Sequence, residues 1–257
     1  MSANRAQRTF RTAAVIIKRR DFGESDRLLT VLTPRFGKID VIAKGARKLT
    51  SHTTGHVELF TRSEMLIHRG RDLGILAQCE MTEPYQLLRE DLTRGAYANY
   101  AAELLDRFTL TGDEDGSALF KLFDYTLARL CNDDDPLLAV RYYEIHLLDQ
   151  LGYRPQLNMC ASGGESVKPQ DQFFSYADGG VVCVEHATQG SSSVPITVNA
   201  LKLLRHIQRS DFTAVRTLQV PSRVHSDADR VMVGYLTFLL ERRLQSIDFI
   251  QRLRYLP

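Results

Sequence analysis

The 257-residue sequence predicts an α+β protein, with a small β-barrel at the amino terminus and an α-helical region after it. Short runs rich in Val, Ile and Thr occupy residues 10–79, and turns that contain glycine separate them. After Pro84, apolar residues recur every three or four positions, which is the period of a helix that buries one face. We therefore expect one domain over residues 1–84 and a second over residues 85–257.

Five short strands are expected in the first domain, over residues 10–18, 28–33, 39–43, 57–60 together with 65–67, and 73–79. Between the second and third strands, Pro34-Arg35-Phe36-Gly37 has the composition of a tight turn. Five such strands joined by glycine-bearing turns are typical of a closed or partly closed barrel. A five-stranded Greek-key barrel with basic loops is a common platform for single-stranded DNA or RNA.

The second domain is predicted to consist of helices around an irregular middle segment. Helical periodicity covers residues 88–108, 119–130, 137–148, 201–207 and about 227–247. Asp135 has the chemistry of a helix N-cap, and Pro136 suits the first turn, where its missing N–H costs nothing. Gly152 and Pro155 end that helix, and residues of about 153–195 show no regular period.

The charges are divided unequally along the chain, although the net charge is only +2. Residues 1–80 hold 15 Lys and Arg against 8 Asp and Glu, a net charge of +7. The remainder holds 18 against 23, a net charge of −5. Such an asymmetry indicates a partner that is a nucleic acid or another anionic surface.

The sequence also restricts the setting in which the chain works. No apolar run approaches the ~20 residues that a membrane span requires, so we expect no membrane partner. The four cysteines, at positions 79, 131, 160 and 183, are too irregularly spaced for a disulfide framework. We therefore expect the protein in a reducing cytoplasm.

The most informative stretch is the end of the third predicted strand and the turn after it, Val41-Ile42-Ala43-Lys44-Gly45-Ala46-Arg47-Lys48. A strand end is a rigid support, and Gly45 can adopt backbone angles that other residues avoid. Lys44, Arg47 and Lys48 are therefore expected to be exposed and to project together. This arrangement suits a polyanion such as nucleic acid. The simpler alternative is a solvated surface turn.

A series of stretches spread along the chain has the order and spacing of one known family. They are Val15-Ile16-Ile17-Lys18, Gly23-Glu24-Ser25-Asp26-Arg27-Leu28, Thr33, Gly37-Lys38, residues 41–47, Leu151-Gly152-Tyr153-Arg154-Pro155 ahead of Cys160, and Leu244-Gln245-Ser246-Ile247-Asp248-Phe249-Ile250. Together they resemble the RecO family of bacterial DNA repair proteins. No single stretch is as specific as a phosphate-binding loop, but the resemblance covers essentially the whole chain.

The resemblance implies that the barrel is an oligonucleotide-binding barrel, the OB-fold, and that an α-helical domain follows it. It also implies a recombination mediator, associated with the nucleoid, that catalyses no chemical reaction. Such a protein binds and anneals single- and double-stranded DNA, contacts the acidic tail of single-stranded DNA-binding protein, and acts with RecR to load RecA. The residues implied to hold DNA phosphates are Lys44, Arg47, Lys48, Arg27, Arg35 and Lys38. Phe36 is the ring best placed to stack on a base, and a place in the barrel core is its alternative.

The resemblance places the pocket for the partner tail at Arg141 and Tyr142, early on the helix that Pro136 opens. An arginine on an apolar and aromatic surface can receive a carboxylate, because its planar guanidinium matches two oxygens. The alternative is a surface arginine that pairs with Glu144 or Asp135.

Many members of this family carry two Cys-x2-Cys pairs in the middle segment, the spacing of a tetrahedral zinc site. Here the pairs read Cys160-Ala161-Ser162-Gly163 and Cys183-Val184-Glu185-His186. Cys160, Cys183 and His186 are weak candidates for metal ligands, since three ligands leave a closed site incomplete unless another residue contributes. We therefore expect a degenerate zinc-finger-like segment with buried, metal-free cysteines and no cofactor.

Two other functions stay open. Asp113-Glu114-Asp115 and Asp133-Asp134-Asp135 could serve a metal-dependent nuclease, although nuclease carboxylates usually converge from separate elements, so solvated acidic loops are preferred. The chain could also be a protein–protein adaptor whose basic barrel only balances an acidic partner. A Gly-x4-Gly-Lys-Ser/Thr loop is missing, which excludes ATP binding of that type.

Overall fold

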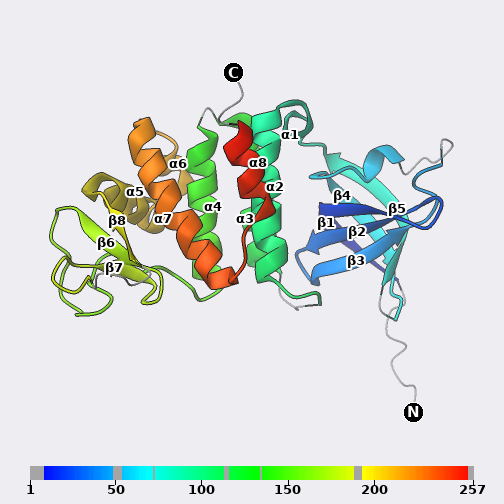
Figure 1. Ribbon diagram of the computed structural model, residues 1–257. Coiled ribbons are helices and arrows are strands. Elements are labelled where there is room, and N and C mark those ends of the chain that lie inside the picture. The colour runs from blue at the N-terminus through cyan, green and yellow to red at the C-terminus, as the bar shows by residue number, and fades with distance from the viewer. Residues whose placement is uncertain are drawn as a thin grey trace, which may run out of the picture. The chain divides into compact units, whose positions relative to one another are not determined.

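The computed structural model describes residues 9–48, 54–71, 73–112, 116–133, 135–187 and 193–253. The chain divides into two compact units, Met1–Cys131 and Asn132–Pro257. A five-stranded barrel dominates the first unit, and helices dominate the second, as Figure 1 shows. The predicted fold class, α+β with an amino-terminal OB-like barrel followed by helices, is confirmed.

The barrel closes in the strand order β1-β2-β3-β5-β4. Its strands are β1 (Thr9–Phe22), β2 (Asp26–Thr33), β3 (Gly37–Ala43), β4 (Arg62–His68) and β5 (Gly74–Glu83). The first half of β1 pairs with β4 and the second half pairs with β2. A register shift between Ile16 and Lys18 bends the strand there, which lets one strand serve both neighbours and close the barrel.

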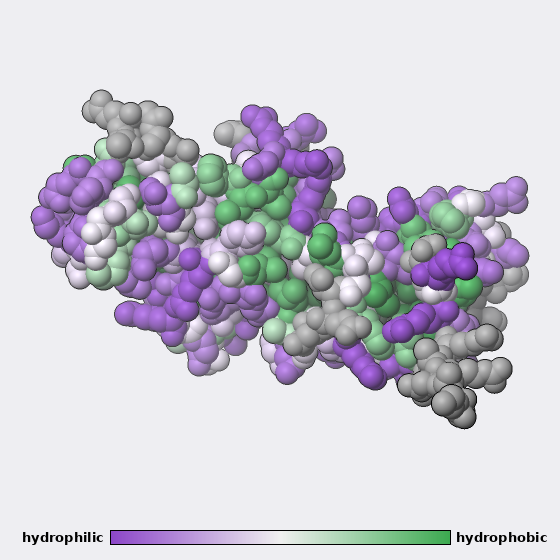
Figure 2. Space-filling model, turned by 90° about the horizontal axis from the view of Figure 1, so that it is seen from below, coloured by the Kyte–Doolittle hydropathy of each residue, from purple (hydrophilic) through white to green (hydrophobic). Residues whose placement is uncertain are grey.

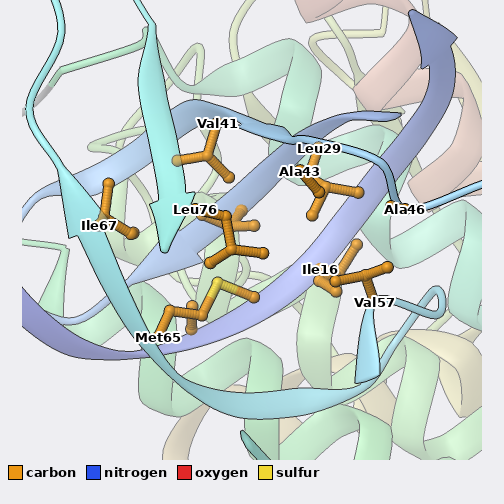
Figure 3. Packing of buried hydrophobic residues seen from close by; sticks show 11 residues of the cluster. Ile16, Leu29, Val41, Ala43, Ala46, Val57, Met65, Ile67 and Leu76 are labelled. Atoms are coloured by element: carbon orange, nitrogen blue, oxygen red, sulfur yellow. The ribbon is translucent and has the colours of Figure 1, made fainter. Parts of the chain in front are cut away.

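Aliphatic side chains from every strand fill the barrel (Figure 3). The buried cluster consists of Ala14, Ile16, Leu29, Val31, Val41, Ala43, Ala46, Val57, Met65, Ile67 and Leu76. These residues alternate with outward-facing ones along the strands, as expected where one face of each strand is buried. Two of them, Ala46 and Val57, come from loops and fill the interior beside the strands.

Two strand predictions need correction. Residues 57–60 are not a strand: they follow a short 3-10 helix, η1 (Thr54–His56), and Phe60 has a left-handed φ of 63°. Strand β1 also extends beyond the predicted end at Lys18, through two arginines, to Phe22. The cations continue the strand because their backbones pair with β2, while the Lys18 and Arg20 side chains are exposed and Arg19 pairs with Glu58.

The first unit also contains helices α1 (Leu87–Glu90), α2 (Leu92–Phe108) and α3 (Ser117–Asn132). A partly buried polar contact holds α3 to the barrel. The Arg62 guanidinium of β4 lies 2.7 Å from Oδ2 of Asp124, and the Tyr85 hydroxyl donates to Oδ1 of Asp124 at 2.8 Å. Burial and the neighbouring Asp124 carboxylate raise the pKa of Tyr85. The hydroxyl therefore stays protonated and keeps donating to Asp124.

The second unit contains helices α4 (Pro136–Gln150), α5 (Val198–Arg209), α6 (Phe212–Val215), α7 (Ser222–Leu240) and α8 (Gln245–Leu253). Asp135 caps α4 as predicted, with its carboxylate accepting from the backbone N–H groups of Leu137 and Leu138. The single helix predicted over about 227–247 is wrong. Glu241 adopts a left-handed conformation, φ 51°, which ends α7 and separates it from α8.

The middle segment is more regular than predicted. It holds strands β6 (Gln172–Ser175), β7 (Gly180–Val182) and β8 (Ser193–Ile196), which form an antiparallel sheet in the order β7-β6-β8. Strands of three or four residues are too short to show a period in the sequence.

Hydrophilic side chains are plentiful on both units over the face shown in Figure 2, and apolar residues lie among them. Within the described parts of the chain, no helix has both the length and the apolar composition needed to cross a membrane.

Candidate nucleic-acid interface

The basic loop (residues 44–48) follows β3 and is fixed from within. Ala46 is fully buried in the barrel core, and its burial fixes the position of the loop. The N–H of Gly45 donates to Oδ1 of Asp26 at 2.7 Å, and the N–H of Arg47 donates to the carbonyl of Ser25 at 2.9 Å. Gly45 has a φ of 65°, which favours glycine. The β1–β2 turn therefore holds the loop backbone in place.

The three cations of the basic loop, Lys44, Arg47 and Lys48, are exposed around buried Ala46. Arg47 lies 3.4 Å from the carboxylate of Asp21, an ion pair open to water on both sides. Exposed pairs of this kind contribute about 0–1 kcal/mol. A DNA phosphate can therefore replace Asp21 at small cost, and all three charges are accessible to a polyanion.

Arg27 lies next to the basic loop, because it pairs with Ala43 in the register of β2 and β3. Its guanidinium is 3.3 Å from Oε1 of Glu58, and Arg19 contacts the other oxygen of the same carboxylate. The Arg27 side chain is only 17% exposed. Its charge is therefore largely engaged with Glu58.

Lys38 lies away from the basic loop and points into the protein. It is 6% exposed, and its Nζ donates to the carbonyl of Asp106 at 2.6 Å, to Oδ1 of Asp106 at 2.9 Å and to the carbonyl of Thr109 at 2.7 Å. Burial by itself would raise the pKa of Asp106, but the hydrogen bond and charge of Lys38 outweigh it and lower that pKa. This geometry assigns Lys38 a structural role at the end of α2.

Arg35 belongs to a second group of side chains, the aromatic–arginine cluster (Phe10, Arg35, Phe36 and Arg69). The rings of Phe10 and Phe36 have centroids 4.3 Å apart. Arg35 lies 5.4 Å from the centroid of Phe36, and Arg69 lies 5.8 Å and 5.7 Å from the two centroids. Half-buried rings bordered by exposed guanidinium groups are a common platform for single-stranded nucleic acid.

The two groups lie at opposite ends of β3. Arg35 precedes the strand and Lys44 follows it, and seven residues at a strand's rise give a separation of about 23 Å. Sequence reasoning placed Arg35 and Phe36 but missed Phe10 and Arg69 as their neighbours. Strands β1 and β4 bring those residues together by long-range pairing, so no local pattern marks them.

Arg141 is 2% exposed, on a helix that is buried on several sides. Its guanidinium lies 2.9 Å from Oε2 of Glu144 and 3.0 Å from Oδ1 of Asp229. A surface pair of Arg141 with Glu144 was one alternative predicted from the sequence. The pair does form, but it lies in the interior and not at the surface. Tyr142 is half-buried and packs against His146 and Phe212, with centroids 4.0 and 5.2 Å apart.

Sequence reasoning missed a groove in the second unit, here called the α5 groove, with a volume of about 630 Å³. Its lining includes the cations Lys202, Arg205 and Arg209, and it contains no acid among the described residues. Apolar side chains line it as well: Leu203, Leu218, Val220 and Val224. The cations recur every three or four residues on α5, and this periodicity is the signal that could have revealed the groove.

The acidic runs considered for a nuclease are only partly described. Residues 113–115 and Asp134 lie outside the described residues. Asp133 pairs with Arg216 at 3.1 Å, and Asp135 caps α4 and contacts His225 at 3.0 Å. The described acids of the second run therefore have structural partners.

The other sequence-predicted residues, Cys160, Cys183 and His186, lie together at the edge of the three-stranded sheet, where Glu165 joins them. This arrangement is developed as a further inference below.

Comparison with known proteins agrees with this architecture along nearly the whole chain. Residues 7–85 match the family description "Recombination protein O N terminal", and residues 89–248 match "Recombination protein O C terminal". The chain is 39% identical over 247 residues to the DNA repair protein RecO of Roseiflexus sp. (strain RS-1), which covers 96% of this chain and 87% of that protein. It is 34% identical over 248 residues to the DNA repair protein RecO of Pelotomaculum thermopropionicum, with 96% of each covered.

The RecO protein of Dehalococcoides mccartyi (strain BAV1) is 32% identical over 245 residues, with 95% of this chain and 96% of that protein covered. The two family matches follow the order of this chain's own structure, with residues 7–85 covering the barrel and residues 89–248 covering the helices after it. The chain therefore belongs to the RecO family of proteins that act in DNA repair and recombination.

Proposed function

We propose that this protein is a non-enzymatic recombination mediator that binds and anneals DNA in the cytoplasm, at the nucleoid. Membership of the RecO family supports a role in DNA repair. The single observation that carries the DNA-binding part is the basic loop, where three exposed cations surround a buried alanine that fixes the backbone.

The basic loop suits phosphates more than bases, because cations without a shaped pocket read charge and not sequence. Such contacts serve single- and double-stranded DNA alike. The aromatic–arginine cluster adds rings on which the bases of a single strand can stack. Exposed Phe22, whose partner in the β-ladder is Asp26, offers a further ring near the basic loop.

Annealing follows from the same electrostatics. Two complementary strands repel each other through their phosphates, and cations that neutralise part of this charge lower the repulsion when the strands meet. The loop cations neither form nor break a covalent bond in the DNA strands, so this step needs no catalytic residue.

We further propose that the α5 groove receives the acidic tail of single-stranded DNA-binding protein. Three cations beside apolar walls complement a peptide that carries carboxylates and apolar side chains. Lys202 and Arg209 are exposed and available to carboxylates, while Arg205 donates to the carbonyl of Leu157 at 2.7 Å and is partly fixed. Arg141 is less suited to this task, because its guanidinium is buried between two acids.

This contact would bring the protein to coated single strands, where it acts with RecR to load RecA. That last step rests on family membership, since no feature described above is assigned to either partner.

An annealing assay tests the proposal with complementary strands coated by single-stranded DNA-binding protein, either intact or lacking its acidic tail. We expect annealing of strands coated with the intact protein, and weaker annealing when the tail is removed. The strands should keep their full length in magnesium and in manganese. Shortened strands would indicate a nuclease, and a protein that binds the tail but ignores naked DNA would indicate an adaptor.

The double variant Lys202→Glu/Arg209→Glu separates the groove from the DNA site. We expect it to lose tail binding in a peptide titration while its binding to naked DNA stays close to that of the unaltered chain. Arg242→Glu/Arg243→Glu is the matched control, since it makes the same charge change at exposed cations outside the groove. Equal loss of tail binding in both variants would mean that net charge, and not the groove, binds the tail.

A further inference from the structure

The middle segment, which the sequence predicted to be zinc-finger-like but degenerate, brings four potential metal ligands together. Sγ of Cys160, Sγ of Cys183, Nδ1 of His186 and a carboxylate oxygen of Glu165 all lie within 4.8 Å of one another. Cys183 directly follows β7, and His186 lies in the turn after it. The N–H of Ala161 donates to the carbonyl of Val181 at 2.8 Å, which ties the loop that carries Cys160 to the same strand.

The distances are close to those of a tetrahedral metal site. With zinc–ligand bonds of ordinary length, the two sulfurs lie about 3.8 Å apart, and a sulfur and a nitrogen lie about 3.5 Å apart. The Sγ atoms of Cys160 and Cys183 are 3.8 Å apart, and Sγ of Cys160 is 3.7 Å from Nδ1 of His186. Sγ of Cys183 lies nearer to Nδ1 of His186 and to Oε1 of Glu165, at 3.0 and 2.9 Å, because these atoms are in hydrogen-bonding contact. To complete the tetrahedron, Sγ of Cys183 must move away from these two atoms by about 0.5 Å. The ligand atoms of Cys160 and Glu165, the widest pair within the 4.8 Å limit, must approach each other by about 1 Å.

Gly163 explains how Glu165 comes to be there. Residue 163 is where the family pattern has the second cysteine of the first pair. A Cβ built on Gly163 would lie 2.1 Å from Oε2 of Glu165 and 2.5 Å from Cε1 of His186. The position therefore points into the ligand cluster, and the Glu165 carboxylate occupies the space that a side chain at 163 would fill.

The surroundings of Cys160 also suit a metal-bound sulfur. Cys160 is 2% exposed, and the backbone N–H groups of Gly163 and Cys183 both point at its Sγ, at 3.4 Å each. Donors around a ligand sulfur stabilise its negative charge and fix its orientation. The turn itself is closed by backbone bonds from Cys160 to Glu165 and from Gly164 to Cys160, both 2.8 Å. These bonds therefore fix the backbone of Glu165 close to that of Cys160.

We propose that Cys160, Cys183, His186 and Glu165 bind one zinc ion, and that Glu165 replaces the cysteine missing from residue 163. The set has two sulfurs, one nitrogen and one oxygen, four ligands that zinc accepts in a closed structural site. The sequence supplied three ligands, and the expectation of a metal-free segment depended on the lack of a fourth. The proposal is independent of the DNA-binding function.

Metal content of the full chain, purified without a histidine tag, gives the first readout. We expect one zinc per chain. The second readout is titration of the zinc-free protein with cobalt, because thiolate-to-cobalt absorption and strong visible bands mark a tetrahedral site that contains sulfur. A chain that holds neither metal would overturn the proposal.

Variants test the role of Glu165 itself. Glu165→Ala should weaken zinc binding by at least about tenfold, as even the loss of a group that only supports a ligand does. The Glu165 side chain is 43% exposed, so the fold should tolerate the change. The matched control is Asp178→Ala, which removes an exposed carboxylate of the same middle segment that lies outside the four-ligand cluster.

The double variant Gly163→Cys/Glu165→Ala returns the missing sulfur and removes the nearer of the two side chains that a Cβ at 163 would meet, so that only the His186 ring has to shift. We expect it to recover zinc binding and to intensify the thiolate-to-cobalt absorption, because a third sulfur joins the ion. If Glu165→Ala bound zinc as tightly as the unaltered chain, or if Asp178→Ala weakened zinc binding as much as Glu165→Ala, Glu165 would not be the fourth ligand.

Discussion

Replacing the three cations of the basic loop is the strongest test of how this protein holds DNA. The variant is Lys44→Ala/Arg47→Ala/Lys48→Ala. All three side chains are exposed, and the loop backbone is fixed by Ala46, Asp26 and Ser25, none of which changes. We therefore expect a folded protein with lower affinity for DNA.

The expected loss follows from counterion release. Each phosphate contact on single-stranded DNA adds about −0.7 to the slope of log affinity against log salt, so three contacts account for a slope of about −2.1. Extrapolated from 1 M salt, three contacts contribute about 500-fold in affinity at 50 mM salt and about 30-fold at 200 mM. Because Arg47 must leave Asp21, these figures are upper bounds for the loop.

The assay is fluorescence anisotropy with a labelled oligonucleotide at several salt concentrations between 50 and 200 mM. Lys121→Ala/Arg242→Ala/Arg243→Ala is the matched control, because it removes three exposed cations outside the barrel. We expect the loop variant to have a slope about 2 smaller in magnitude than the unaltered chain, and the control to keep its slope. Equal slopes for the loop variant and the unaltered chain would refute the reasoning, whatever the change in affinity at one salt concentration.

Two further predictions concern cations that the structure buries. Arg141→Ala should lower the free energy of unfolding by about 3–5 kcal/mol, because it leaves fully buried Glu144 without its partner, and a loss below 1 kcal/mol in urea denaturation would contradict this. Lys38→Met should cost about 2–3 kcal/mol at pH 7, because the Nζ hydrogen bonds to Asp106 and Thr109 are lost. The pKa of Asp106 is lower in the folded state, so its interaction with Lys38 stabilises the fold above the unfolded-state pKa and is lost as pH falls through the folded-state pKa. Lys38→Met lacks this interaction. Its urea midpoint should therefore fall less between pH 6 and pH 3 than that of the unaltered chain.

The barrel could be predicted because its signals are local. Alternating apolar residues mark the strands, and the turns between them carry glycines that the backbone needs, such as Gly37 and Gly45, both with positive φ. Residues 57–60 misled because Val57 and Phe60 are buried like strand residues but belong to a loop that helps to fill the barrel. The apolar pattern of residues 57–60 therefore indicated burial and not strand structure.

The basic loop was also predictable, since strand, glycine and cations are consecutive in the sequence. Lys38 has the same local signal, a cation beside a glycine at a strand end, yet it is buried. Its partners, Asp106 and Thr109, lie about 70 residues further along the chain and depend on how α2 packs on the barrel. The sequence shows which residues carry charge, but only the tertiary contacts show which charges remain available.

Arg141 illustrates the same limit and shows where a signal was overlooked. In α4 the apolar residues surround the axis, because Leu138, Ala139, Val140, Tyr143 and Ile145 are all buried. A helix that is apolar on every side is an interior helix, and an arginine in its middle must then be buried and paired. The pair with Glu144, three residues away, is readable from that pattern. Asp229 is not, since it comes from α7, 88 residues away, and reaches Arg141 only when the helices pack.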